Sequence, residues 1–143
     1  MKRLQIPRPL LIALVILTIV IVINAVFFWV HIVFAEKVEL GGYDHQTQST
    51  VELTGEEAFK LSCIYNLSLF GGHVNAEPCC DSYWFQVTYL DGNTIYVGEG
   101  VEEKDKMILQ FPNNPNRSPV YVTNPWLIDY IHSLIEKYGL PID

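Results

Sequence analysis

Three cysteines, Cys63, Cys79 and Cys80, carry the greatest capacity for covalent chemistry in this 143-residue sequence. They follow a long N-terminal apolar run that indicates an extracytoplasmic domain, where disulfides are permitted. A bridge from Cys63 to Cys79 or Cys80 closes a loop of roughly 16–18 residues, worth about 3 kcal/mol through lost chain entropy. We expect such a bridge, with one thiol left free or joining two chains. A strained vicinal disulfide between Cys79 and Cys80 is the alternative.

Metal binding and thiol catalysis are two further interpretations of the same region. Zinc sites usually take their thiolates from C-x₂₋₄-C pairs, which adjacent cysteines do not match. A nucleophilic cysteine paired with His73 lacks an orienting third group at a recognisable spacing. We therefore expect no catalytic residue, metal or cofactor, and keep a thiol-redox or metal-binding envelope protein as an alternative. The candidate donors for such a site are His45, Cys63, His73, Cys79, Cys80 and Asp81.

A cluster of carboxylates lies further along the chain, at Glu99, Glu102, Glu103 and Asp105. Such a cluster can hold calcium loosely, but it lacks the Asp/Asn alternation and fixed glycine of an EF-hand loop. We interpret it as a solvated charged turn.

Residues 10–35 form the apolar run, and they contain no charged side chain. Roughly 20 helical residues cross a hydrocarbon core of about 30 Å, so we expect a transmembrane helix here. Lys2, Arg3 and Arg8 precede the run, and the positive-inside rule then places residues 1–9 in the cytoplasm. The sequence thus predicts a single-pass signal anchor that contacts the lipid bilayer through residues 10–35, with everything after it extracytoplasmic.

A cleaved signal peptide is the rival interpretation, with Val33-Phe34-Ala35 as a passable cleavage site. The hydrophobic region of a signal peptide spans only about 7–15 residues, so the length favours a permanent anchor. Asn24 lies near the middle of the run, where a carboxamide in lipid favours a partner on another helix. An accessory subunit that associates through its helix is therefore kept as an alternative, while the other interpretation is that Asn24 bonds locally to its own helix.

The part of the chain after the apolar run is acidic. Only six of the nine Lys and Arg residues follow the run, against 16 Asp and Glu, which gives this part a formal charge of -10. Nucleic acids and anionic lipid surfaces reward clusters of Lys and Arg. We therefore expect no nucleic-acid partner, and expect neutral or basic partners instead.

The polar, glycine-containing residues 36–52 are typical of a stalk, with a short strand around residues 50–53. Thr54 and Glu57 then form a capping box that predicts a helix, which Gly71-Gly72 ends. The apolar face of this helix repeats at helical spacing and has a second row that widens it. The first row is Ala58, Leu61, Ser62, Tyr65 and Leu69, and the second is Phe59, Cys63, Leu67 and Phe70.

Two β-rich segments, 83–90 and 93–97, flank Asp91-Gly92 and predict a β-hairpin with a two-residue type I′ turn. This turn pairs Leu90 with Asn93 and Val87 with Tyr96. One face of the hairpin, the expected core side, then carries Tyr83, Phe85, Val87, Tyr89 and Tyr96. The other carries Trp84, Gln86, Thr88, Leu90, Ile95 and Val97.

Further strands are expected at residues 107–111 and 120–122, before a last helix with Asn124 as cap, Pro125 in its first turn and Gly139 at its end. The order of elements predicts an α+β domain over residues 53–143. We expect an antiparallel sheet of three to five strands with two helices packed on one face.

The function that we expect is a membrane-tethered binding or regulatory module without catalytic activity. Eight Tyr and three Trp exceed what one small core needs. Some of them, Trp84 and Trp126 among them, are therefore candidates for an exposed contact patch. The expected partner is a protein or a component of the cell envelope.

Overall fold

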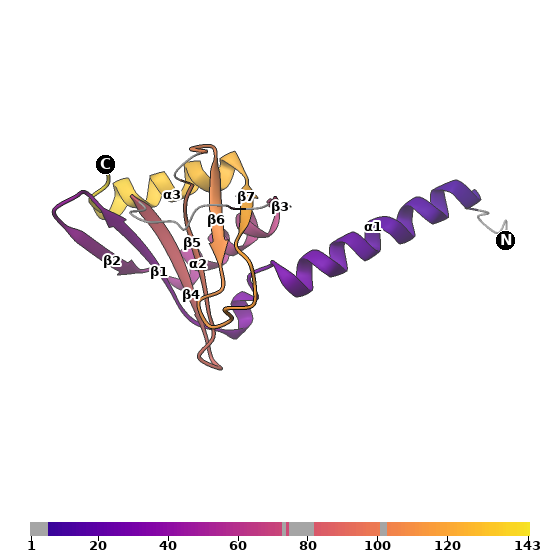
Figure 1. Cartoon of the computed structure of the whole chain (residues 1–143), viewed down its shortest axis with the longest axis horizontal. Helices are drawn as coiled ribbons and strands as arrows, with labels where there is room; N and C mark the ends of the chain where they lie inside the picture. The colour runs from indigo at the N-terminus through magenta and orange to yellow at the C-terminus, as the bar shows by residue number, and fades with distance from the viewer. Residues whose placement is uncertain (1–5, 73, 75–81, 101–102) are drawn as a thin grey trace.

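A long helix projects from an α+β domain, in a computed structural model that describes residues 6–72, 74, 82–100 and 103–143 (Figure 1). The domain contains an antiparallel sheet and two further α-helices. This confirms the predicted α+β class with an apolar N-terminal helix. The calls on Cys79, Cys80, His73, Asp81 and Glu102 lie outside the described residues.

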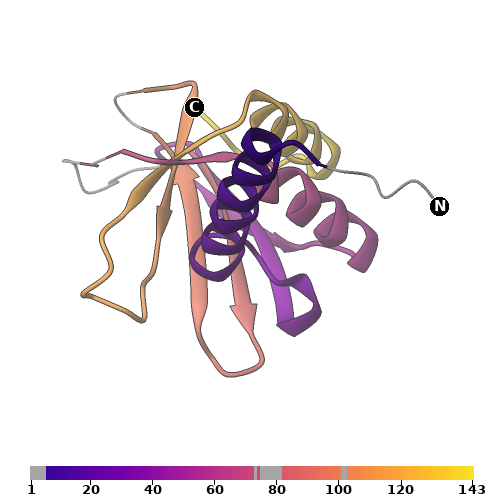
Figure 2. The same cartoon turned by 90° about the vertical axis from the view of Figure 1, so that its right-hand side faces the viewer.

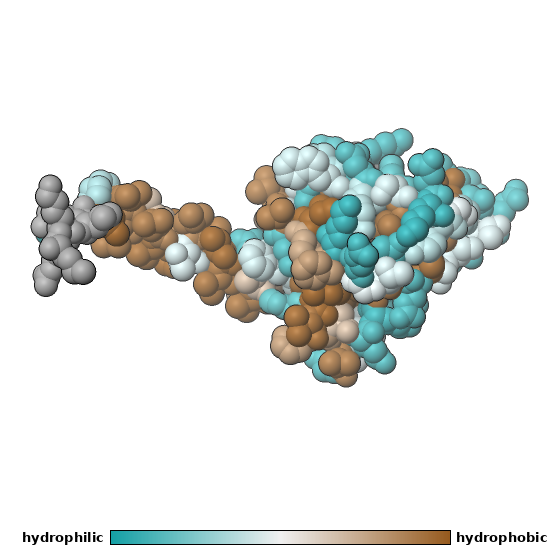
Figure 3. All heavy atoms as spheres, turned by 180° about the vertical axis from the view of Figure 1, so that it is seen from behind, coloured by the Kyte–Doolittle hydropathy of each residue, from teal (hydrophilic) through white to brown (hydrophobic). Residues whose placement is uncertain are grey.

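The projecting helix is α1 (Arg8–Phe27), which has no buried residue (Figure 3). At about 1.5 Å per residue its 20 residues extend about 30 Å. The segment Arg8–Phe34 is long and apolar enough to cross a membrane. The helix itself ends eight residues before the predicted boundary at residue 35, and a short 3₁₀ turn, η1 (Ile32–Phe34), follows. The helix ends early because the chain after it packs against the domain, where Val30 is only 3% exposed and belongs to the core.

The sheet has seven strands, more than the three to five that were predicted, and every neighbouring pair is antiparallel. Their order across the sheet is β2-β1-β4-β5-β6-β7-β3. The strands are β1 (Ala35–Tyr43), β2 (Gln48–Glu52), β3 (Leu69–Gly71), β4 (Tyr83–Tyr89), β5 (Thr94–Glu99), β6 (Lys106–Gln110) and β7 (Val120–Thr123).

The segment expected as a stalk accounts for much of the difference, because it forms β1 and β2. β1 lies between β2 and β4, and its Val38 and Leu40 are buried. Gly41 in β1 has a packing role, since a Cβ atom at this position would lie 2.2 Å from the Trp84 ring. The glycine in the segment expected as a stalk therefore permits the Trp84 indole to lie close against β1.

The β4–β5 hairpin forms where it was predicted, but its register differs by one residue. The loop has three residues, Leu90 to Gly92, with Gly92 at a φ of 84°. Val87 therefore pairs with Ile95 instead of Tyr96. Because side chains alternate between faces, this slip turns Ile95 and Val97 into the core and turns Tyr96 outward. The expected core side of β4 is correct, and its buried members are Tyr83, Phe85 and Val87.

Both remaining helices, α2 (Gly55–Asn66) and α3 (Pro125–Tyr138), pack on the same face of the sheet (Figure 2). The predicted capping box of α2 is present, as are the Asn124 cap of α3 and its left-handed end at Gly139. The buried residues of α3 are Leu127, Ile131, Leu134 and Ile135.

The predicted second row of the first helix is wrong for Phe59, Cys63 and Leu67, whereas Phe70 packs against the core from β3. In the predicted first row, Leu69 is 75% exposed. Phe59 is 60% exposed, Leu67 is 73% exposed, and Cys63 is also exposed. The helix ends at Asn66, before the predicted Gly71-Gly72, because Leu69–Gly71 pairs with β7 as the edge strand β3. Only the first row, from Ala58 to Tyr65, faces the sheet.

Glu57 joins the start of α2 to the end of α3. Its carboxylate accepts hydrogen bonds from Lys137, from the Tyr138 hydroxyl at 2.6 Å and from the Thr54 backbone N–H at 3.1 Å. The Lys137 bond, followed by that of Tyr138, lowers the pKa of Glu57 to about 2. The carboxylate in the capping box of α2 thus also binds the last turn of α3.

Candidate functional site

The cysteines lie only partly within the described chain. Cys63 is exposed on α2 and forms no disulfide with another residue that the structure describes. Of the candidate metal ligands, His45 lies 3.1 Å from the carboxylate of Asp143. Within residues 6–72, 74, 82–100 and 103–143, no group of three His, Cys, Asp or Glu side chains is placed to hold a metal ion. The predicted bridge from Cys63 stays a prediction.

The two tryptophans of the expected contact patch do not share a surface. Trp84 is 9% exposed and stacks on Tyr96, with 6.3 Å between ring centroids, on the face of the sheet opposite the helices. Trp126 is 71% exposed at the start of α3. Trp126 alone of the pair is available to a partner.

Two other predicted positions have local partners. The Asn24 side chain donates to the Val20 carbonyl at 2.8 Å, which is the local bonding expected as the alternative to helix association. In the acidic loop, Glu103 pairs with Lys106, and Glu99 accepts the Ser82 N–H at 3.3 Å. These two carboxylates therefore have protein partners.

The structure places a different site at the junction between α1 and the domain. After α1 the chain makes three hydrogen bonds, one to α2 and two to the β4–β5 hairpin. The Tyr65 hydroxyl donates to the Phe28 carbonyl at 2.8 Å, and the Leu90 N–H donates to the Phe34 carbonyl at 2.9 Å. Between them, the N–H of His31 donates to the Tyr89 hydroxyl at 3.3 Å. Residues 28–34, the junction segment, are thus fixed to α2 and to the hairpin.

Arg117, in the loop between β6 and β7, binds the end of α1. Its guanidinium donates to the carbonyl of Phe27 and lies 3.6 Å from the ring centroid of Phe111. A cation suits this position, because the last carbonyls of a helix carry partial negative charge. Partial burial lowers the pKa of Arg117 below its ordinary value.

A pocket of about 490 Å³ opens where these elements meet. The last turn of α1, the junction segment, the β4–β5 hairpin and the β6–β7 loop form its walls. Its lining is largely aromatic and aliphatic with a few polar groups, a composition typical of ligand sites. The lining residues are Val26, Phe27, Trp29, His31, Phe34, Tyr89, Leu90, Asp91, Asn93, Thr94, Ile95, Phe111, Asn113, Asn114 and Arg117.

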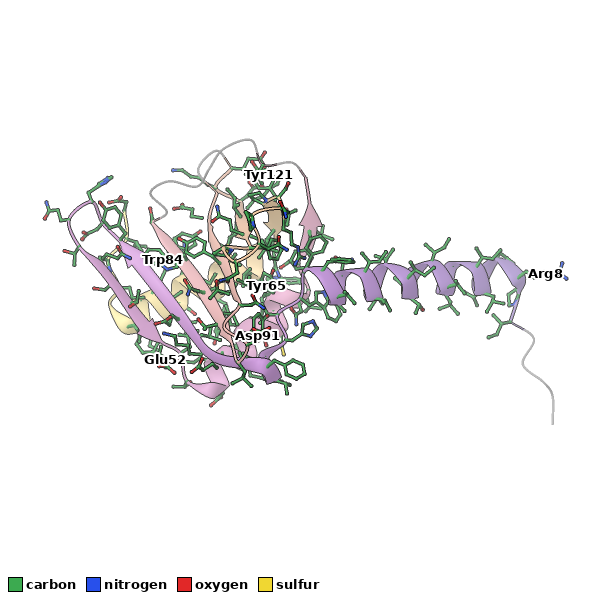
Figure 4. The ribbon with its side chains drawn as sticks, turned by 60° about the horizontal axis from the view of Figure 1, so that its bottom comes forward. Arg8, Glu52, Tyr65, Trp84, Asp91 and Tyr121 are labelled. Carbon is green, nitrogen blue, oxygen red and sulfur yellow. The ribbon has the colours of Figure 1, made fainter. Side chains whose placement is uncertain are left out.

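The two loops that flank the pocket are joined directly. The Asn113 side-chain oxygen accepts both the N–H and the hydroxyl of Thr94, each at 2.7 Å. Asp91, labelled in Figure 4, accepts the backbone N–H and the side-chain amide of Asn93, and these bonds lower its pKa. The hydrogen bonds hold both walls in place and keep the Asp91 carboxylate ionised.

Sequence reasoning missed this pocket because its parts come from four separate segments. Arg117 stands in a Pro/Asn-rich stretch that reads only as a turn. One signal was available, since Arg117 is the only arginine after Arg8. Its partners, however, depend on the tertiary packing of the β6–β7 loop against α1.

Comparison with known proteins identifies no relative: no family matches this chain, and no curated protein or solved structure does. A functional assignment therefore depends on the geometry of the chain itself.

Proposed function

We propose that this protein is a single-pass membrane protein whose extracytoplasmic domain binds a ligand in the pocket beside the end of its anchor. The observation that carries the proposal is that Phe27 of α1 and Arg117 of the domain line one pocket and contact each other. The site thus exists only while the helix and the domain remain one folded unit.

The geometry of α1 supports a membrane crossing. Its length of about 30 Å matches the hydrocarbon core of a bilayer. Arg8 lies at the end of α1 away from the domain (Figure 4), and Lys2 and Arg3 precede it in the sequence. The positive-inside rule then gives a cytoplasmic N-terminus and an outer domain.

The junction segment supports retention of the anchor. A signal peptidase that cut after Ala35 would remove Val30, which is buried in the core, and Phe28, which stacks on Phe70 at 5.3 Å between ring centroids. It would also break the bonds from Tyr65 and Leu90 to the junction segment. A leader that is cleaved off is not expected to contribute side chains to the core of the mature domain.

The lining of the pocket supports binding over catalysis. Among the described residues that line it there is no serine or cysteine, and its Thr94 hydroxyl is already bonded to Asn113. Its aromatic rings and fixed polar groups suit a ligand that is partly apolar. We therefore propose a binding or regulatory role for the site.

Site-specific photo-crosslinking in intact membranes tests this function. A photoreactive residue in place of Asn114, which is exposed and lines the pocket, is expected to capture a defined adduct. The matched control is the same residue in place of Glu136, which is exposed on α3 away from the pocket. The same adducts in equal yield from both positions, or no adduct from position 114, would argue against a binding site here.

Association through α1 is a second candidate function, because α1 has no buried residue and most of its side chains are exposed. Asn24 supplies a carboxamide near the middle of this surface. Replacing residues 10–25 with an unrelated apolar helix, while keeping Val26, Phe27 and the junction segment, would abolish an accessory role and leave pocket binding intact.

A thiol-based function is a third candidate, since the Cys63 thiol is exposed. Counting thiols on intact and reduced protein, together with metal analysis, tests it. Three unreactive cysteines and no bound metal would exclude it.

A further inference from the structure

Two opposite charges line the pocket without pairing to each other, and they indicate the class of its ligand. The Arg117 guanidinium and the Asp91 carboxylate both belong to its wall. In the part of the chain that the structure describes, neither takes part in an ion pair. A ligand that carries both a positive and a negative group would satisfy each of them.

Arg117 is suited to an oxyanion. Among the described residues its hydrogen-bond acceptor is the Phe27 carbonyl, while one face of the guanidinium lies against Phe111. Arginine has five N–H donors in a planar fork that matches phosphate geometry. Donors therefore remain for a phosphate that enters the pocket, and partial removal from water strengthens that interaction.

Asp91 is suited to a cation. Both of its hydrogen bonds come from the neutral Asn93, at 2.9 and 2.8 Å, so its negative charge is not compensated. Trp29, Phe34 and Tyr89 line the same pocket, and the faces of aromatic rings attract ammonium groups. The hairpin side of the pocket thus favours an amine.

The rest of the molecule restricts the ligand further. The formal charge of -10 after the apolar run opposes a ligand with net negative charge, so a phosphate must bring its own cation. Val26 and Phe27 connect the pocket with the apolar surface of α1. Exposed apolar side chains also gather over η1 and the hairpin, where Val33 and Leu90 are 82% and 70% exposed (Figure 3).

We propose that the pocket binds the head group of a zwitterionic phospholipid in the outer leaflet. The phosphate contacts Arg117, the ammonium group lies at Asp91, and the acyl chains extend along α1. This inference rests on the proposed function, because it requires α1 to cross the membrane and the pocket to be a binding site.

Native mass spectrometry of the full-length chain, released from nanodiscs that contain equal amounts of phosphatidylethanolamine and phosphatidylglycerol with identical acyl chains, tests the inference. We expect phosphatidylethanolamine to be retained in about tenfold excess, which corresponds to about 1.4 kcal/mol. Asp91→Asn leaves Arg117 as the only charge of the pair, so the preference should reverse toward phosphatidylglycerol. Asp91→Glu keeps the charge and should keep the original preference.

The matched control is Asp129→Asn, which changes the net charge equally at an exposed position on α3. It should not alter lipid preference. Equal retention of the two lipids by the unaltered chain, or a reversal produced equally by Asp129→Asn, would overturn the inference. So would water-soluble glycerophosphoethanolamine that binds as tightly as the lipid, since the acyl chains would then contribute nothing.

Failure of this inference is distinguishable from failure of the proposed function. If no lipid is retained but the photoreactive residue at position 114 captures a protein or an envelope component, the binding function stands and the lipid assignment falls. If position 114 captures nothing and no lipid is retained, both fall.

Discussion

Asn66, the last residue of α2, pairs with both backbone polar groups of Val30. Its side-chain oxygen accepts the Val30 N–H at 2.8 Å, and its amide donates to the Val30 carbonyl at 3.1 Å. Just after α1, the Asn66 side chain thus makes the pair of backbone hydrogen bonds that a neighbouring β-strand would otherwise make. This pairing lets Val30 enter the core with its backbone satisfied.

Asn66→Ala removes both hydrogen bonds and leaves the Val30 backbone groups without their protein partners. We expect the free energy of unfolding to fall by about 2 kcal/mol, at about 1 kcal/mol for each bond. Urea unfolding in detergent measures this change, and faster proteolysis within residues 28–34 should accompany it. Asn116→Ala, at an exposed position of the β6–β7 loop, is the control and should be neutral. Equal stability of the two variants would show that the pairing does not fix the junction.

Truncation before and after the junction segment separates an integral anchor from a removable leader. A chain of residues 28–143 keeps Val30, whereas a chain of residues 36–143 loses it together with its bonds to Asn66. Burial of one valine contributes roughly 1.5–3 kcal/mol, so the shorter chain should be less stable by at least that amount. The midpoints of urea unfolding compare the two. Equal midpoints would mean that residues 28–35 are dispensable to the fold.

Local signals in the sequence were enough to locate the helices. The extra strands and the register of the hairpin depend on tertiary packing, which local signals do not show. The caps at Thr54 and Asn124 are short-range patterns, and both are present. The segment 36–52 lacks the alternation of a half-buried strand, since β1 lies inside the sheet and contains Gly41 under Trp84. The predicted register of the hairpin was wrong because Asp91-Gly92 also fits a three-residue loop. A shift of one residue in the pairing exchanges the two faces of β5.

Glu57 makes the stability of the domain depend on pH. Its folded pKa of about 2 lies below the ordinary value of 4.5. Its contribution is therefore complete above the ordinary pKa and is lost as the pH falls from about 4.5 toward 2. Glu57→Gln should reduce stability by about 2 kcal/mol at pH 7, and the difference from the unaltered protein should shrink by pH 3.

Thermal or urea unfolding at both pH values measures the effect of Glu57→Gln. Glu56→Gln is the matched control, because Glu56 is exposed in the same turn of α2. It should change stability by only a few tenths of a kcal/mol. A Glu57→Gln difference that is the same at pH 7 and pH 3 would contradict the role of the carboxylate.

Gly41→Ala tests the close approach between β1 and the indole. The new Cβ atom would lie 2.2 Å from the Trp84 ring, so the indole or the strand must shift. We expect a loss of about 1–3 kcal/mol, typical of overpacking, with a change in tryptophan emission. At Gly55 a Cβ would meet nothing within 4 Å, so Gly55→Ala is the control and should not destabilise. A Gly41→Ala variant as stable as Gly55→Ala would contradict the packing described.

The pocket could not be predicted from the sequence, and the reason differs from that for the strands. Cysteines, tryptophans and carboxylate clusters are recognised as candidate sites by residue type alone. Cys63, Trp84 and the acidic loop were therefore considered as candidate sites from the sequence. The pocket instead depends on Arg117 reaching the Phe27 carbonyl across 90 positions of the chain. No local pattern encodes a contact of that range.

The central claim is that the anchor is a permanent part of the folded protein, and the intact mass of the chain purified from membranes tests it most directly. The protein should be recovered in the membrane fraction at its full-length mass of 16.4 kDa, once any C-terminal tag is subtracted. A mature species that begins at Glu36 and leaves the membrane would contradict the claim, because neither the pocket nor the junction could then exist as described.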